Sequence, residues 1–215
     1  MKKYTKNIGL ILIILGALTL VSTRFSNFST HNGLLLTGLF CIIAGIYLHI
    51  RSIKNDSLYW TIMNKQEQYR ELLLQLGGLI QGENDETSVM ANTAALIHQT
   101  FHFWWIGFYR VVNGELLLGA FQGPVACYHI AKGRGVCGTA WAERRTQVVP
   151  DVEQFPGHIA CSSESKSEIV VPIYNKVGDV MAVLDIDSEH LGTFDATDQE
   201  YLEQVCQLVS ETIYP

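Results

Sequence analysis

Two apolar segments near the N-terminus constrain the fold of this chain more than any other feature. Residues 8–21 carry no charge, and residues 33–50 form a second apolar run that contains one histidine, His49. A membrane-spanning helix needs about 20 apolar residues, with about 17 as the lower limit. The second run meets this length, whereas the first meets it only if Ser22 and Thr23 are included. We therefore predict two transmembrane helices.

The charges around these runs predict how the helices are oriented. Basic residues lie outside both runs, at Lys2, Lys3, Lys6, Arg51 and Lys54. Between the runs, the basic residue is Arg24. Since basic residues favour the cytoplasmic side of a membrane, we expect both outer ends to face the cytoplasm. The rest of the chain then lies there too, as the soluble part of a multi-pass protein of the cell membrane.

A signal peptide is the alternative for the first run, because the lysines before it resemble the basic start of such a peptide. However, no cleavage motif of small residues precedes the connecting segment, and a second apolar run follows at once. We therefore favour a membrane hairpin over residues 1–55, with helices at about 8–23 and 33–50. A soluble domain over residues 56–215 follows it.

Net charge and cysteine content narrow the function of the soluble part. The formal net charge of -6 argues against nucleic-acid binding, which requires a basic surface. The cysteines form an odd-numbered set of 5, too sparse for a secreted disulfide scaffold. A reducing compartment is therefore expected, which agrees with the cytoplasmic location predicted above.

Residue patterns in the soluble part predict an α+β domain. Apolar residues recur with helical spacing at 56–81, 89–101 and 197–213. Between them, Asn113-Gly114 separates two apolar runs, which indicates a β-hairpin. The expected strands are residues 105–112, 115–121, 128–131, 147–149, 168–175 and 179–186, with a short helix at 138–145. Helices at both ends of an antiparallel sheet define the α+β class.

Three cysteines are the first candidates for chemistry: Cys127, Cys137 and Cys161 each lie among glycine, proline or polar residues. Cys161 lies in the polar segment 151–167, whose length is typical of a functional or disordered loop. Cys137 lies near the expected start of a helix, where the helix dipole lowers the pKa of a thiol. The spacing differs from the close pairs of a zinc finger and suits one thiol that reacts and another that resolves it.

Other roles for these three cysteines stay open at this point. They could pack as ordinary buried thiols, or they could bind a metal ion together with His158. Cys206 has helical apolar spacing and Cys41 lies in the second apolar run. Both are expected to pack as small apolar residues.

Acidic residues are the second group of candidates. Asp185 and Asp187 are two residues apart at the end of one expected strand, so their side chains share a face. Glu168 opens the strand predicted to pair with it. One such carboxylate commonly caps a turn, but three together indicate a pocket. This cluster could hold an amino group and keep one carboxyl protonated, because neighbouring carboxylates raise each other's pKa.

Aromatic residues precede these acidic strands. Trp105 and Tyr109 alternate onto one face of the strand expected at 105–112. They either pack against a helix or form an apolar wall of the same pocket.

These candidates lie in stretches that closely resemble the free methionine-(R)-sulfoxide reductases, a group of GAF-domain enzymes. The matching stretches are residues 105–109 (WIGFY), 121–127 (FQGPVAC), 133–140 (GRGVCGTA), 157–161 (GHIAC), 167–172 (SEIVVP) and 184–188 (LDIDS). The resemblance covers about residues 60–214 and is specific, because GAF domains in general lack all three cysteines. The hairpin departs from it, since typical members are soluble.

The resemblance implies a role for each candidate. Cys161 would be the nucleophile, Cys127 the main resolving thiol and Cys137 an auxiliary thiol. The three carboxylates would bind and activate the substrate, and Trp105 and Tyr109 would line its methyl end. The resemblance also implies an external thioredoxin-like reductant, preference for the R epimer, a homodimer and a part in the oxidative stress response.

The sequence therefore predicts reduction of free methionine-(R)-sulfoxide without a metal or organic cofactor. Cys161 attacks the sulfoxide sulfur, Glu168 protonates the leaving oxygen, and Asp185 and Asp187 pair with the free ammonium group. The resulting sulfenic acid then condenses with Cys127. Two alternatives are a membrane-tethered GAF sensor that binds a small ligand or reports redox state without turnover, and a structural zinc module.

Overall fold

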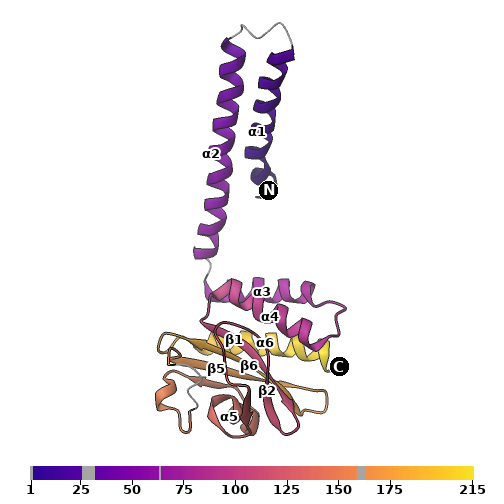
Figure 1. Ribbon diagram of the computed structural model, residues 1–215, viewed down its shortest axis with the longest axis vertical. Helices are drawn as coiled ribbons and strands as arrows, with labels where there is room; N and C mark the ends of the chain where they lie inside the picture. Colours follow the sequence, from indigo (N-terminus) through magenta and orange to yellow (C-terminus); the bar gives the residue numbers. More distant parts are fainter. Residues whose placement is uncertain (1, 26–31, 63, 159–162) are drawn as a thin grey trace. The chain divides into compact units, whose positions relative to one another are not determined.

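The computed structural model describes residues 2–25, 32–62, 64–158 and 163–215. The chain divides into two compact units, Met1–Met63 and Asn64–Pro215. Figure 1 shows the first as a pair of helices and the second as a sheet with helices packed on it.

The first unit contains the helices α1 (Lys2–Phe25) and α2 (Asn32–Ile62). In the described helices, the stretch Asn32–Arg51 has a mean hydropathy of 2.1 and is long and apolar enough to cross a membrane by length and composition. The apolar part of α1, Ile8–Ser22, is shorter.

Helix α2 continues past the boundary that we predicted at residue 55. Residues 51–62 contain neither glycine nor proline, so nothing in this polar stretch interrupts the helix. The helix expected over 56–81 is consequently two helices: the end of α2 and α3 (Lys65–Leu79). The side chain of Asn64 caps α3 by accepting a hydrogen bond of 2.9 Å from the backbone N–H of Glu67.

Two further long helices complete the helical layer of the second unit. Helix α4 (Glu86–Phe101) begins after Asp85, whose side chain accepts from the N–H of Ser88. Helix α6 (Ala196–Ile213) begins with a capping box between Asp195 and Asp198. Asp198 also binds Lys65 at 2.6 Å and Tyr69 at 2.8 Å, which ties α3 to α6.

Within the described residues of this unit, the strands form one antiparallel sheet with the order β3-β2-β1-β6-β5-β4. The strands are β1 (Trp105–Val112), β2 (Glu115–Gln122), β3 (His129–Ala131), β4 (Gln147–Val149), β5 (Ser167–Tyr174) and β6 (Val180–Ser188). Asn113 and Gly114 form the predicted turn between β1 and β2, and both have positive φ. The predicted α+β class and GAF-like arrangement are confirmed.

The two faces of this sheet pack against different layers. Alternate strand residues such as Phe108, Ile169 and Leu184 are buried against α3, α4 and α6, with Cys206 among them as predicted. The opposite face carries Trp105, Tyr109 and Val170 and is covered by α5 (Gly135–Glu143). Figure 1 shows α4 and α6 on one side of the sheet and α5 on the other.

Two local differences from the expected pattern affect the site. Helix α5 begins at Gly135 instead of residue 138, so Cys137 lies inside its first turn. A glycine at position 138 permits this, because a Cβ there would lie 2.3 Å from the carbonyl oxygen of Ala131. The polar segment after β4 contains a short 3-10 helix, η1 (Val152–Gln154), capped by the side chain of Asp151.

Candidate active site

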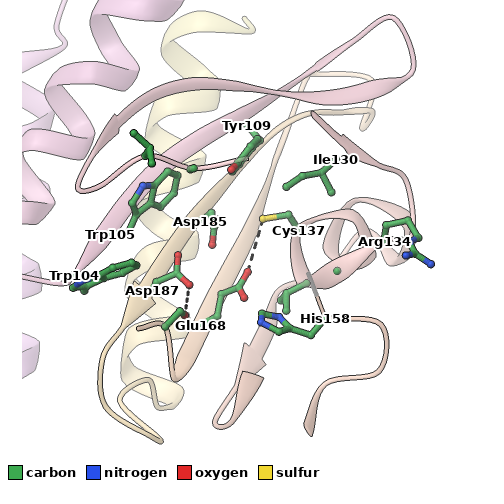
Figure 2. A pocket seen from close by; sticks show the side chains of 15 residues that line it. Trp104, Trp105, Tyr109, Ile130, Arg134, Cys137, His158, Glu168, Asp185 and Asp187 are labelled. Carbon is green, nitrogen blue, oxygen red and sulfur yellow. Dashed lines mark hydrogen bonds between the residues drawn. The ribbon is translucent and has the colours of Figure 1, made fainter. Parts of the chain in front are cut away.

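The three predicted carboxylates meet on the sheet face under α5. Strand β6 lies between β1 and β5, and Asp187 is paired with Trp105 on one side and Glu168 on the other. Asp185 is paired in the same way with Gly107 and Val170. All these residues therefore point to one side of the sheet, as predicted. Figure 2 shows the carboxylates facing the same pocket.

Burial disfavours the ionised forms of these three carboxyl groups. The pKa of Glu168 is raised well above its ordinary value, first by burial and then by Asp185 and Asp187. Burial also raises the pKa of Asp185, with Asp187 as the second cause. The pKa of Asp187 rises to about 6 through burial, although a hydrogen bond from the Ser165 hydroxyl opposes the shift. The protonated form of Glu168, which can donate a proton, is therefore favoured first by burial and then by the neighbouring carboxylates that we predicted as the cause.

One oxygen of this cluster lacks a protein partner. Among the described side chains, Asp185 Oδ1 is buried and accepts no hydrogen bond. Asp185 is 6% exposed, so water does not easily satisfy this oxygen. A buried acceptor without a partner is costly and indicates that a ligand donor completes the site.

Two aromatic side chains form one wall of the pocket, which is the second of the two arrangements that the sequence left open. The rings of Trp105 and Tyr109 are stacked with their centroids 6.0 Å apart, and both are buried. Trp105 Nε1 donates to the carbonyl of Pro124 at 3.0 Å. The hydroxyl of Tyr109 donates to the carbonyl of Cys127 at 3.1 Å. The wall thus also holds the segment that carries Cys127.

Glycines make room for the Trp105 ring. A Cβ on Gly107 would lie 2.3 Å from its outer edge, and a Cβ on Gly123 would lie 2.7 Å from its Cδ1. Gly123 also has a φ of 133°, which few other residues adopt. The aromatic wall therefore depends on glycine at both positions.

Cys137 differs from the prediction made for a thiol at a helix start. It is buried, and its Sγ donates to Glu168 Oε1 over a long distance of 3.9 Å. Burial raises its pKa well above the ordinary value, and the charges of Asp185 and Glu168 raise it further. These effects outweigh the helix dipole, so Cys137 is a protonated thiol and the expected depression of its pKa is wrong.

The structure gives information on only one of the other two candidate cysteines. Cys127 takes part in a disulfide bond. Cys161 falls in residues 159–162, outside the described residues, so its predicted role has no geometric test. The free thiols in the described part of the chain are Cys41, Cys137 and Cys206.

The structure adds pocket residues that the sequence argument did not assign. Trp104, Ser165 and the first residues of α5 line the pocket. His158 also lines it, and its Nδ1 is buried without a described hydrogen-bond partner. The position of His158 shortly before Cys161 was a sequence signal for a pocket residue. A single serine in a polar loop, such as Ser165, gives no such signal.

A metal-type donor set also exists here, but it is not the predicted one. Ligand atoms of Cys137, Glu168 and Asp185 lie within 4.8 Å of one another. The predicted set combined Cys127, Cys137 and Cys161 with His158. Because the described set shares two carboxylates with the pocket, a metal ion bound there would occupy the place of any ligand amino group.

The fold, the pocket and the sequence agree on the class of this domain. A family model described as GAF domain matches residues 83–213. GAF domain-containing protein A of Dictyostelium discoideum is 54% identical over 147 residues, which cover 68% of this chain and 92% of that protein.

Other relatives identify the family within this class. The free methionine-R-sulfoxide reductase of Saccharomyces cerevisiae is 42% identical over 162 residues, 72% of this chain and 90% of that protein. A crystal structure of the free methionine-R-sulfoxide reductase of Neisseria meningitidis with its substrate is 47% identical, with a TM-score of 0.68, and covers 70% of this chain and 90% of that chain. The chain belongs to the free methionine-R-sulfoxide reductase family.

Proposed function

We propose that this pocket reduces free methionine-R-sulfoxide to free methionine through a thiol and disulfide sequence. The observation that carries the proposal is the buried Asp185 Oδ1, which has no described hydrogen-bond partner and lies in a pocket that Asp187 and Trp105 also line. Free methionine sulfoxide has an ammonium group that would bind Asp185 and Asp187 and a small apolar end that would contact Trp105.

The first step is the attack of the Cys161 thiolate on the sulfoxide sulfur. Glu168 lines the pocket, and its raised pKa favours the protonated form, so it would supply the proton that the sulfoxide oxygen needs. The oxygen passes to the cysteine sulfur, which is oxidised to a sulfenic acid while the sulfoxide is reduced to the thioether. One oxygen atom and two electrons are thereby exchanged.

The second step converts the sulfenic acid into a disulfide. The Cys127 thiol attacks the Cys161 sulfenic acid, forms a disulfide and releases water. The disulfide at Cys127 in the structure supports its capacity for this role. A thioredoxin-like dithiol protein then exchanges with the disulfide, so no metal or organic cofactor enters the cycle. Cys137 remains a protonated auxiliary thiol beside Glu168.

Recognition of the free amino acid follows from the charges of the pocket. Asp185 and Asp187 would accept hydrogen bonds from the ammonium group, and its positive charge would favour their ionised forms. The first residues of α5 line the same pocket, and the N–H groups at a helix start suit a substrate carboxylate. A sulfoxide inside a protein chain has neither charge, which explains selection of the free form.

The test compares free methionine-R-sulfoxide with its N-acetyl derivative, which lacks the ammonium charge. We expect the intact chain to use the free form, and Asp187→Asn to raise its KM by about tenfold to a hundredfold, the cost of one charged hydrogen bond. The KM for the N-acetyl derivative should not change in this variant. Equal effects on both substrates would remove the ammonium contact, and no methionine formation with either would favour a ligand-binding sensor.

A further inference from the structure

The helices of the first unit touch each other through glycine. A Cβ on Gly9 would lie 2.8 Å from the carbonyl oxygen of Gly45, and one on Gly16 would lie 2.6 Å from that of Gly38. Within each helix the two glycines are seven residues apart, so both contacts lie on one seam of an antiparallel pair. The backbones approach closely at these two levels, as small residues permit in membrane helices.

Many large apolar side chains of the pair point away from the glycine contacts. Leu18 is 59% exposed on α1, and Leu36 and Phe40 are 65% and 70% exposed on α2. The exposed large apolar residues in the described part of the pair are Ile8, Leu10, Ile11, Ile14, Leu15, Leu18, Val21, Leu34, Leu36, Leu39, Phe40, Ile43, Ile46, Tyr47, Leu48 and Ile50. Their number far exceeds what a water-soluble surface exposes in one patch.

Three described hydroxyl groups in the apolar stretches of the pair donate hydrogen bonds within their own helices. Thr19 donates to the carbonyl of Leu15 at 2.9 Å, and Thr37 donates to that of Gly33 at 2.8 Å. Ser22 donates to the carbonyl of Thr19 at 2.8 Å. These groups therefore do not need water, which meets a condition for a helix surrounded by lipid.

Length and charge fit the same environment. The 20-residue apolar stretch Asn32–Arg51 is about 30 Å long, the thickness of a bilayer core. Ile8–Ser22 is shorter, at roughly 22 Å, and needs local thinning of the bilayer or help from flanking lysines. Since Gly9 meets Gly45, the start of α1 and Arg51 lie at the same end of the pair. Lys2, Lys3, Lys6, Arg51 and Lys54 therefore belong to this end of the pair, where anionic headgroups would meet them, and Arg24 belongs to the other.

We propose that α1 and α2 form a two-span membrane anchor closed by the glycine seam, with lipid covering its outer surface and both ends on the cytoplasmic side. Lipid is the occupant that fits, because apolar side chains point outward on both helices instead of forming one stripe. A second copy of the chain would cover one side of the pair and leave the rest in water. The anchor would hold the second unit at the inner surface of the membrane.

The first test is extraction of the full-length chain from membranes. We expect it to stay in the membrane pellet during an alkaline carbonate wash and to dissolve in a nonionic detergent. The double variant Leu36→Lys and Ile43→Lys should move it to the carbonate supernatant. Its matched control, Leu74→Lys and Val177→Lys, changes residues that are 75% and 82% exposed in the second unit and should stay in the pellet.

Retained thiol-dependent reduction in these variants would show that the second unit is folded. Release of the unmodified chain by carbonate would overturn the proposal. Tags at the two ends should both be cut by protease in inside-out vesicles and protected in right-side-out vesicles. Cleavage of the two tags from opposite sides would overturn the hairpin.

The glycine seam has its own test, which uses Cys41 as a reporter. Cys41 lies on α2 between Gly38 and Gly45 and is partly buried. Gly45→Leu should open the pair and raise the rate at which a membrane-permeable maleimide labels Cys41, as measured by mass spectrometry of that peptide. Gly33→Leu, on the same helix with nothing within 4 Å of its Cβ position, should leave the rate unchanged. Equal rates in both variants would overturn the seam.

Discussion

The face of the sheet under α3, α4 and α6 and the face under α5 take alternate residues of the same strands. On β6, Leu184 and Ile186 belong to the apolar core, whereas Asp185 and Asp187 face the pocket. Burial of the first pair stabilises the fold by about 25 cal/mol per Å² of apolar surface. Burial of the second pair disfavours their charged forms and raises their pKa values. Such a cost indicates a site selected for chemistry instead of stability.

The same contrast separates two buried thiols. Cys206 lies in the apolar core, where its Sγ approaches the carbonyl of Val171 at 4.0 Å. Cys137 lies on the other face against Glu168. Burial raises the pKa of both thiols, so neither is poised as a thiolate. Neither thiol is therefore suited to the role of nucleophile, which we propose for Cys161.

The largest expected effect is on methionine formation, and it should separate the proposed nucleophile from a thiol that only packs in the core. Cys161→Ser should abolish methionine formation, because serine cannot take up the sulfoxide oxygen. Cys206→Ser should leave kcat/KM unchanged and lower the free energy of unfolding by about 1–3 kcal/mol, since it buries a hydroxyl in the apolar core. Steady-state assays and chemical denaturation of both variants measure this. Equal loss of turnover would contradict the assigned roles.

Effects of intermediate size are expected on stability and activity when Leu184 and its neighbour Asp185 on β6 are changed in turn. Leu184→Ala should lower the free energy of unfolding by about 2–5 kcal/mol and preserve the activity of the folded fraction. Asp185→Asn should preserve or raise the free energy of unfolding, because it removes a buried carboxyl that costs stability. It should lower the activity, because that carboxyl would bind substrate. Tryptophan fluorescence during urea unfolding, with activity measured on the same samples, gives both quantities. Stability lost in both variants would mean that Asp185 is a structural residue.

The smallest expected effect is a dependence on pH. The pKa of Asp187 is raised from 3.8 to about 6, so the folded protein binds more protons than the unfolded chain in this window. The stability of the ligand-free protein should therefore fall as the pH rises from about 4 to 6. Substrate binding needs the ionised form, so KM should rise as the pH falls below about 6, by at most about tenfold per pH unit. Asp187→Asn should flatten both profiles below pH 6.

Periodicity and local turn signals were sufficient to predict much of the fold and the carboxylate cluster. The alternation of Asp185 and Asp187 along a strand placed both on one face, and pairing with Glu168 followed from the hairpin. The pKa of Cys137 could not be predicted in this way. Its burial depends on how α5 packs on the sheet, which is a property of tertiary structure.

Two other features of the structure were not predicted from the sequence. Helix α2 continues through residues 51–62 because no helix breaker interrupts it, although the composition changes from apolar to polar there. Ser165 reaches Asp187 only because the polar segment after η1 returns to the end of β6. Contacts of this kind come from chain topology instead of neighbouring residues.

The hydrogen bonds from Trp105 and Tyr109 to the carbonyls of Pro124 and Cys127 couple two parts of the site. The rings that would fit the substrate's methyl group also fix the position of the segment that bears Cys127, which we propose as the resolving thiol. A change in either ring would alter both the shape accepted and the distance over which the sulfenic acid is resolved. Substrate preference and recycling therefore cannot evolve independently at these two positions.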